Sequence, residues 1–297
     1  MGRVTGTLRK IAPLLGESTA VECLREFIVG VSLLPQPVLL TGESGTGKGL
    51  AARKIHAVGR TARLPFIKIS CANLATEELE QLLFGGVEGG QLSGVLRLEE
   101  GSTCYLSGVE CMPNSLVKLL YEYLLANSDK EGPRLIFSSE LPFHDLLEGR
   151  ILDSRFLELI SVYHMCISPL RERVEDIPVL CHYQVWLNTT AEEYSHCWER
   201  FEKEILPEML SYPWPGNVAE LIEVISEYCA LEKDQLSRES SDALQNPEHA
   251  MQEFLREEFE QLYQELLLHL ELEDLTGRTD LVLHPGLDGK NYREHAN

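Results

Sequence analysis

The sequence predicts an α/β fold in which a parallel sheet is flanked by helices, followed by a small all-helical domain and an acidic helical tail. Short apolar runs alternate with segments of helical periodicity up to residue 174, which is typical of strand–helix–strand units. From Glu175 onward the strand pattern stops. We therefore expect an N-terminal segment at 1–12, an α/β domain at 13–174, a helical domain at 175–232 and a tail at 233–297.

The α/β domain is expected to alternate helices with short strands. Apolar residues recur at helical spacing over 18–34, and Pro35 and Pro37 end that helix. Further helices are predicted at 48–58, 76–84 and 115–125. Short apolar runs predict buried strands at 38–40, 66–69, 104–106 and 135–137. Because helices connect successive strands, both faces of the sheet should be covered.

The remaining chain is expected to be helical. Helices are predicted at 177–187, 198–211 and 218–231, and the polar residues 232–247 predict a linker. Asn246 and Pro247 suit the start of another helix, in which apolar residues repeat every three or four positions to about residue 273. Its apolar stripe favours packing on the helical domain, and pairing with a partner helix is the alternative. The end of the chain, from Thr276, is expected to be loose.

Charge and composition narrow the classes of function. The formal net charge of −21 argues against a broad nucleic-acid-binding surface, because phosphate contacts need clustered Lys and Arg. The sequence contains no run of about 18 apolar residues, so no membrane partner is expected. The eight cysteines form no CxxC pair, and several lie in apolar runs. This pattern predicts buried, reduced thiols in a cytoplasmic protein.

The strongest local signal is the stretch GESGTGK at 42–48, which follows a predicted strand and opens a predicted helix. In this G-x-x-x-x-G-K spacing the backbone amides wrap a phosphate chain, the helix N-terminus adds partial positive charge, and Lys48 reaches the outer phosphates. The next position usually carries Ser or Thr, whose hydroxyl binds Mg²⁺, and here it is Gly49. The stretch therefore predicts a nucleotide phosphate site with one metal contact weakened.

Several stretches together resemble the central AAA+ domain of bacterial enhancer-binding proteins, the ATPases that remodel sigma-54 RNA polymerase. The shared motifs are GESGTGK at 42–48, RLPFI at 63–67, SCA at 70–72, LLFG at 82–85, PLRER at 169–173, EDIP at 175–178 and YPWPGNV at 212–218. The resemblance covers roughly residues 13–231. It implies a P-loop AAA+ nucleotide-binding domain, a helical lid, ATP or ADP bound between them, and assembly into a ring.

The resemblance also indicates which residues would contact the nucleotide. Leu15 and Gly16 fall in the family's segment near the adenine. The candidate cofactor-binding residues are Leu15, Gly16, Gly42, Glu43, Ser44, Gly45, Thr46, Gly47, Lys48, Gly49 and Leu50. No catalytic residue and no metal ligand is assigned, and the sequence leaves open whether Mg²⁺ accompanies the nucleotide.

The chain departs from the family pattern where hydrolysis is carried out. The family strand that ends in an Asp–Glu pair aligns with 103–109, so Ser107 replaces the magnesium-side carboxylate and Gly108 replaces the one that readies water. Glu110 lies two residues beyond that place. Loss of a general base costs a factor of about 10² to 10⁴ in rate. The GAFTGA-type insertion that contacts sigma-54 is replaced by a short glycine-rich stretch at 86–94.

Other positions of the family's hydrolytic machinery also differ. The polar sensor, the lid arginine and the two trans-acting arginines align with Glu140, Ala219, Asp153 and Leu159, respectively. Arg150 and Arg155 lie close enough for a small shift to restore one arginine finger, a group worth about 10³ to 10⁵ in rate.

These departures lead to three alternatives. The first is a hydrolysis-deficient protein that binds ATP or ADP and acts in transcription regulation or signalling through protein partners, including copies of itself. Direct DNA binding is not expected, because residues 236–297 hold 5 Lys and Arg against 14 Asp and Glu. The second is an active ATPase in which Glu110 or Glu140 supplies the carboxylate and Arg150 or Arg155 the finger. The third is a structural interaction protein whose nucleotide site is vestigial.

Overall fold

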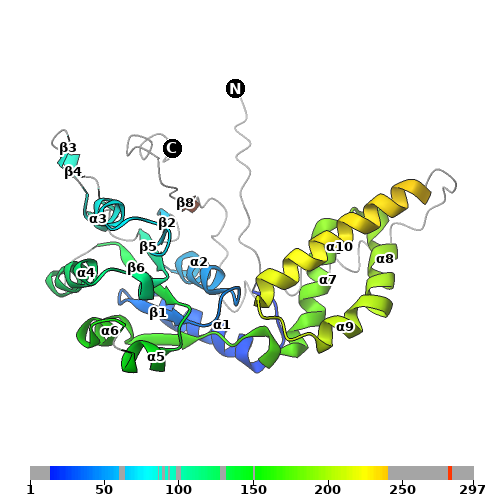
Figure 1. Cartoon of the computed structure of the whole chain (residues 1–297), viewed down its shortest axis with the longest axis horizontal. Helices are drawn as coiled ribbons and strands as arrows, with labels where there is room; N and C mark the ends of the chain where they lie inside the picture. Colours follow the sequence, from blue (N-terminus) through cyan, green and yellow to red (C-terminus); the bar gives the residue numbers. More distant parts are fainter. Residues whose placement is uncertain are drawn as a thin grey trace.

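The α/β domain and the helical domain, which we call the lid, form two lobes of the chain (Figure 1). A computed structural model describes residues 14–59, 64–85, 87–88, 91–92, 94–97, 102–127, 132–149, 151–239 and 280–282. The α/β fold followed by a helical lid is confirmed. The amphipathic helix predicted at 247–273 lies outside the described residues.

The main sheet is parallel and brings the ends of its strands to one edge. Its strands are β1 (Val38–Thr41), β2 (Phe66–Ser70), β5 (Thr103–Ser107), β6 (Arg134–Ser139), β7 (Tyr163–Cys166) and β8 (Asp280–Val282). They lie in the order β7-β1-β6-β5-β2-β8, and every adjacent pair is parallel. Thr41 lies opposite Ser139, and Ser107 lies opposite Ser138. Because ligands of open α/β sheets bind outside the carboxyl ends of the strands, this edge positions the candidate site.

Helices cover both faces of the sheet. They are α1 (Thr19–Ser32), α2 (Lys48–Val58), α3 (Thr76–Phe84), α4 (Asn114–Ala126), α5 (Phe143–Glu148) and α6 (Ser154–Ile160). Successive strand residues point to opposite faces. Val38 and Leu40 therefore pack in one core with residues of α1 and α2, whereas Leu39 packs in the other with residues of α3, α4 and α6. All three side chains are fully buried.

The lid is built from four helices around a core of its own. They are α7 (Ile177–Asn188), α8 (Ala191–Arg200), α9 (Leu206–Ser211) and α10 (Asn217–Glu239), with a π-helical turn η5 (Phe201–Ile205) between α8 and α9. Phe201 and Trp214 are buried in this core. Two 3₁₀ turns, η3 (Leu170–Glu172) and η4 (Val174–Asp176), lead from the sheet into α7.

Several predicted elements need correction. The sequence missed β7, which carries a polar His and is only half buried, and the short helices α5 and α6. The helix predicted at 198–211 is interrupted by η5, and α10 continues to Glu239 through the first half of the predicted linker. The C-terminal stretch expected to be loose contains β8, which pairs with β2 and forms one edge of the sheet.

Cysteine burial only partly follows the prediction. All eight thiols are free, and five of them are buried, but Cys23, Cys111 and Cys166 are exposed.

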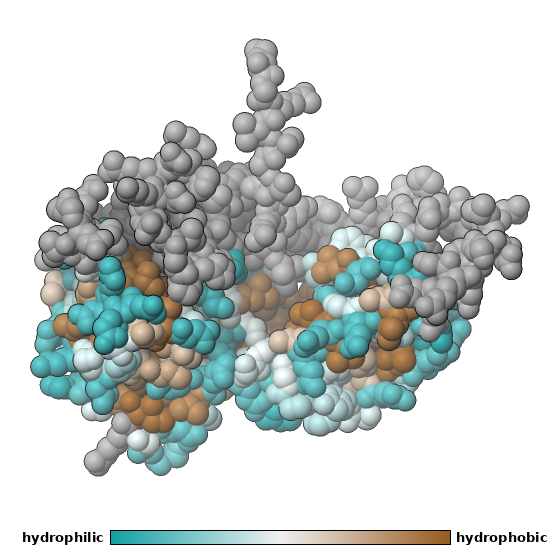
Figure 2. Space-filling view, turned by 45° about the horizontal axis from the view of Figure 1, so that its top comes forward, coloured by the Kyte–Doolittle hydropathy of each residue, from teal (hydrophilic) through white to brown (hydrophobic). Residues whose placement is uncertain are grey.

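The described surface visible in Figure 2 is mostly hydrophilic on both lobes, with scattered apolar patches, which agrees with the high charge of the chain. Among the helices that the structure describes, none is long and apolar enough to cross a membrane.

Arg134 at the start of β6 stabilises the end of α1. Arg134 is 5% exposed, and its guanidinium donates to the Ser32 carbonyl at 2.8 Å and to the Val31 carbonyl. Burial lowers the pKa of Arg134 to about 10. The last turn of α1 carries no basic residue of its own. We expect Arg134→Met to lower the free energy of unfolding by about 1–3 kcal/mol, because two buried carbonyls lose their donor. Urea denaturation would measure this, and the exposed Arg97→Met serves as control; equal losses in both variants would contradict the prediction.

Candidate functional site: a phosphate loop beneath the lid

The phosphate loop joins β1 to α2 and depends on its glycines. Gly42, Gly45 and Gly47 have φ angles of 146°, 76° and 106°, which residues with a side chain adopt only at a cost. The Thr46 hydroxyl donates to the Glu43 carbonyl at 2.8 Å and tightens the turn. No side chain caps α2 at Gly47. The loop therefore leads into a helix N-terminus, where amides and the helix dipole favour an anion.

Lys48 is folded back onto its own loop. Its ammonium donates to the Gly42 carbonyl at 2.6 Å and to the Glu43 carbonyl at 2.7 Å, and the residue is 9% exposed. Burial lowers the Lys48 pKa, and the charges of Glu140, Glu110 and Glu43 oppose that shift. Two carboxylates from the carboxyl edge of the sheet, those of Glu110 and Glu140, therefore act on the charge that would meet a phosphate.

Glu43 is held from the lid side. Both terminal nitrogens of Arg171 donate to its carboxylate, one of them at 2.7 Å, and the Asn217 amide donates to it at 3.2 Å. These hydrogen bonds, that of Arg171 first, lower the Glu43 pKa to about 2. Glu43 therefore remains ionised at any physiological pH, and its charge is matched by Arg171.

The lid lies directly on the phosphate loop. Asn217 donates to the Ser44 carbonyl at 2.9 Å, and the Ala219 amide donates to the Gly45 carbonyl at 3.3 Å. A Cβ on Gly45 would lie 2.1 Å from the Gly216 carbonyl oxygen, so only glycine fits there. Ala219, which the resemblance aligns with a lid arginine, contributes its backbone amide to this contact.

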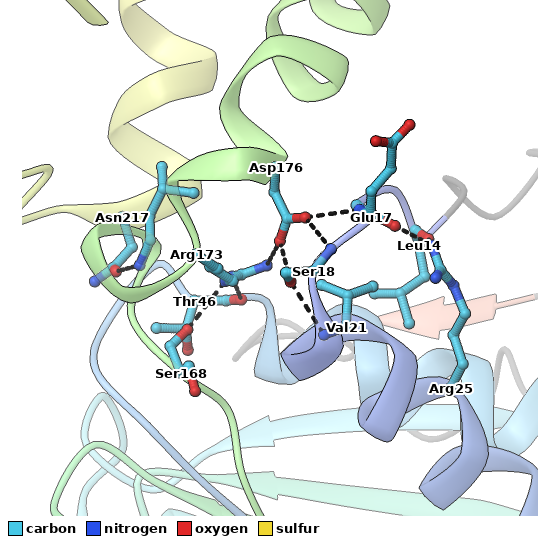
Figure 3. Close-up of polar contacts among 12 residues, drawn as sticks. Leu14, Glu17, Ser18, Val21, Arg25, Thr46, Ser168, Arg173, Asp176 and Asn217 are labelled. Atoms are coloured by element: carbon cyan, nitrogen blue, oxygen red, sulfur yellow. Dashed lines mark hydrogen bonds and ion pairs between the residues drawn. The ribbon is translucent and has the colours of Figure 1, made fainter. Parts of the chain in front are cut away.

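A second connection ties the residues just before α1 to the loop (Figure 3). The fully buried carboxylate of Asp176 accepts from the Glu17 amide at 2.7 Å, the Ser18 amide at 2.8 Å and the Ser18 hydroxyl at 2.7 Å. Arg173 lies 3.6 Å from Asp176 and donates to the Thr46 carbonyl at 3.1 Å. This network joins the segment before α1, the phosphate loop and the entry to the lid.

Leu15 and Gly16, which the resemblance assigns to the adenine, belong to the same segment. Leu15 is half buried, and Gly16 is buried with its carbonyl accepting from Arg25 at 2.6 Å. At the other end of the candidate set, Gly49 lies near the Tyr105 ring, and Leu50 packs partly against the core beneath α1 and α2. The contacts of Leu50 are therefore those of a packing residue.

The end of β5 has no carboxylate at the two family positions. The Ser107 hydroxyl donates to the Ile69 carbonyl at 3.4 Å, and Gly108 has a φ of 73° in the left-handed region. The chain then enters the 3₁₀ turn η2 (Val109–Cys111). There the Glu110 carboxylate accepts from the Glu140 amide at 2.9 Å through one oxygen, and its other oxygen is buried without a hydrogen-bond partner.

The residues aligned with the trans-acting arginines lie in α6 and at its N-cap. Asp153 caps α6 and pairs with Arg155 at 3.3 Å, and Arg155 also lies over the Tyr121 ring. Leu159 is half buried, and Arg150 lies outside the described residues. At the position of the missing insertion, a short antiparallel hairpin pairs β3 (Val87–Glu88) with β4 (Gln91–Leu92). Within the described part of the chain, no group of three or more His, Cys, Asp or Glu could hold a metal ion.

Sequence reasoning missed the residues that join the two lobes at the site. Arg171, Arg173, Asp176 and Asn217 all lie in the motifs PLRER, EDIP and YPWPGNV, but the motifs gave them no role. Their place in these motifs was the only feature of the sequence that could have marked them as functional residues. Arg25 carried no signal at all.

The chain matches two family models and a set of transcriptional regulators. Residues 14–129 match the sigma-54 interaction domain, and residues 171–252 match the AAA+ ATPase lid domain. The chain is 29% identical over 243 residues to the DNA-binding transcriptional regulator NtrC of Rhizobium meliloti (strain 1021), covering 76% of this chain and 50% of that protein. It is 30% identical over 233 residues to the DNA-binding transcriptional activator HyfR of Escherichia coli (strain K12), covering 72% and 34%. The chain thus spans about a third to a half of the length of such relatives.

Solved structures of NtrX from Brucella abortus have a similar fold. The structure in complex with ADP has a TM-score of 0.62 and 25% identity, covering 74% of this chain and 52% of that one. The structure in complex with ATP has a TM-score of 0.66 and 24% identity, covering 90% and 65%.

Proposed function

We propose that this chain, which carries a sigma-54 interaction domain and an AAA+ ATPase lid domain, binds ATP or ADP beneath its lid, hydrolyses ATP slowly at most, and regulates transcription or signalling through protein contacts. The observation that carries the proposal is the contrast between the two sides of the site. The phosphate loop keeps its glycine conformations and its lysine, whereas the adjacent strand ends in Ser107 and Gly108.

The backbone at the end of β5 supports slow hydrolysis. Gly108, at the position that readies water, has no side chain that could act as a general base. Ser107, at the magnesium-side position, carries a neutral hydroxyl that donates to the Ile69 carbonyl. Gly108 adopts a left-handed conformation that costs about 1–2 kcal/mol for a residue with a side chain. A Glu placed at 108 would therefore be strained in this backbone conformation.

Nucleotide titrations test the proposal. We expect a fluorescent ATP analogue and ADP to bind the full chain in the micromolar range, and Lys48→Ala to weaken both at least about ten-fold, because the loop loses its cation. Lys118→Ala, which removes an exposed lysine of α4, is the control. Absence of binding by the wild type would favour the vestigial site. Magnesium-dependent turnover well above background, abolished by Lys48→Ala, would contradict slow hydrolysis.

One observation favours a second function, an ATPase in which Glu110 replaces the missing acidic pair. One carboxylate oxygen of Glu110 is buried without a hydrogen-bond partner, and the charges of Glu110 and Glu140 act on Lys48. The Glu110 carboxylate is therefore suited to bind the cation of a nucleotide complex. Glu110 is the residue that would hold Mg²⁺ here. When bound, Mg²⁺ neutralises charge that develops on the transferred phosphoryl group.

Glu110→Gln separates the two functions. If Glu110 holds Mg²⁺, the substitution should leave nucleotide affinity in EDTA within about two-fold of wild type and remove most of the affinity gained on adding Mg²⁺. Titrations of wild type and variant with and without Mg²⁺ measure this. Glu148→Gln, on the exposed end of α5, is the control. The same Mg²⁺ response in wild type and Glu110→Gln would remove the second function.

A further inference from the structure

We propose that Glu43, Arg171 and Asn217 form a latch that holds the lid on the phosphate loop before nucleotide arrives and thereby raises the affinity of the loop for a nucleoside di- or triphosphate. This inference rests on the proposed function. It assigns part of the nucleotide affinity to side chains that lie outside the backbone that would wrap the phosphates. Arg171 comes from η3 and Asn217 from the start of α10, so two separate parts of the lid side reach one residue of the loop.

Asn217 is the fixed point of the latch. It is fully buried, and its side-chain oxygen accepts from the Leu170 amide at 2.8 Å while its nitrogen donates to Ser44 and Glu43. Its φ of 55° is left-handed, a conformation that Asn tolerates better than most residues. The same side chain therefore positions η3, which carries Arg171, and the loop, which carries Glu43.

Arg171 also solves an electrostatic problem of the loop. Glu43 lies inside the segment that would wrap the phosphates, and its charge acts on the Lys48 ammonium. An unpaired carboxylate there would repel a polyanion, and solvent would screen part of that repulsion because the Glu43 side chain is 42% exposed. The two-nitrogen contact of Arg171 matches the planar carboxylate and cancels its charge. The latch thus orders the loop and removes a repulsion.

The latch stands in for a contact that the lid lacks. At the position of the family's lid arginine, Ala219 offers only its amide to the Gly45 carbonyl. Position 219 carries no charged side chain. Among the residues that the structure describes, Arg171 is the cation on the lid side that pairs with a side chain of the loop. The contact of Arg171 with Glu43 therefore couples lid position to nucleotide affinity in addition to the contacts that the lid side makes with the loop backbone.

A single and a double variant of the full chain test the latch. Calorimetry measures the dissociation constants of ADP and ATP in the presence of EDTA. We expect Arg171→Ala to raise both dissociation constants about three- to ten-fold, the range for a part-exposed but bidentate pair. Glu43→Gln in the Arg171→Ala background should recover at least half of the loss on a logarithmic scale, because the repulsive charge is gone. Arg200→Ala, which removes a lid arginine paired with Glu204 and Glu232, should stay within two-fold of wild type.

Amide hydrogen exchange of the nucleotide-free protein tests whether the latch holds the lid on the loop when no ligand is bound. Arg171→Ala should speed amide exchange in residues 214–220 and at Leu170, whereas Arg200→Ala should leave those amides unchanged. If Arg171→Ala matches wild type in both exchange and affinity, or if the double variant binds as weakly as Arg171→Ala, the latch is overturned. If the wild type binds no nucleotide, the proposed function fails, and the exchange comparison still decides whether the lid contact exists.

Discussion

Asp176→Ala is expected to lower the free energy of unfolding by about 3–5 kcal/mol, the range found when one partner of a buried ion pair is removed. The substitution would leave the buried Arg173 without its carboxylate. It would also remove the acceptor of the Glu17 amide, the Ser18 amide and the Ser18 hydroxyl. Unsatisfied buried donors cost about 1–3 kcal/mol each when nothing replaces the acceptor, so the loss is among the largest that a single side chain here can cause.

Two further variants make this expectation specific. Asp176→Asn keeps one acceptor oxygen and should lose less stability than Asp176→Ala, because part of the network can still form. Glu175→Ala removes the exposed acidic neighbour and should change stability by no more than about 0.5 kcal/mol. Chemical denaturation followed by circular dichroism measures all three. If Asp176→Ala and Glu175→Ala behave alike, the buried network does not stabilise the fold.

Gly45→Ala is expected to separate the lid from the phosphate loop. The new Cβ would lie 2.1 Å from the Gly216 carbonyl, and the residue would keep a φ of 76° only at a cost. Strain of the left-handed backbone and overpacking together disfavour the closed lid by about 2–4 kcal/mol. We expect faster amide exchange in residues 214–220 and at least ten-fold weaker binding of ADP and ATP.

Gly47→Ala is the matched control within the same loop. Gly47 has a φ of 106°, but a Cβ there would meet no atom within 4 Å. It therefore carries the backbone cost without the collision with the lid. Exchange in residues 214–220 should stay near that of the wild type in Gly47→Ala. Equal exchange in the two variants would show that the close approach of Gly216 does not hold the lid in place.

Local patterns predicted the elements that build the site. The stretch from β1 through the loop to α2 combined an apolar run, a glycine spacing and a helical period, and the predicted helix 48–58 has the bounds of α2. The predicted helix 76–84 likewise coincides with α3. Weak elements such as β7 were missed because their few residues are only half buried and show no clear period.

The contacts between lobes could not be read from local pattern. Glu43 and Arg171 are 128 positions apart, and Ser18 and Asp176 are 158 apart, so their pairing depends on the complete fold. The buried role of Arg134 is hidden for the same reason, since its acceptors lie about a hundred residues earlier. The effect of Gly108 was also only half predicted: the missing carboxylate was evident, whereas the left-handed turn that directs the chain to Glu110 was not.

The turn before α10 determines how the lid can move. Trp214 has a φ of 48° yet is held by burial and by its indole donating to the Met209 carbonyl, and the Gly216 amide is bound to Glu220. Trp214 and Asn217 both have left-handed backbone conformations, which are strained for residues other than glycine. Such conformations persist only where the surrounding contacts hold them, so this turn is stiff. A pivot must then lie elsewhere, outside 214–220. A movement of α10 would therefore act on Ser44 and Gly45 through the hydrogen bonds that Asn217 and Ala219 donate to them.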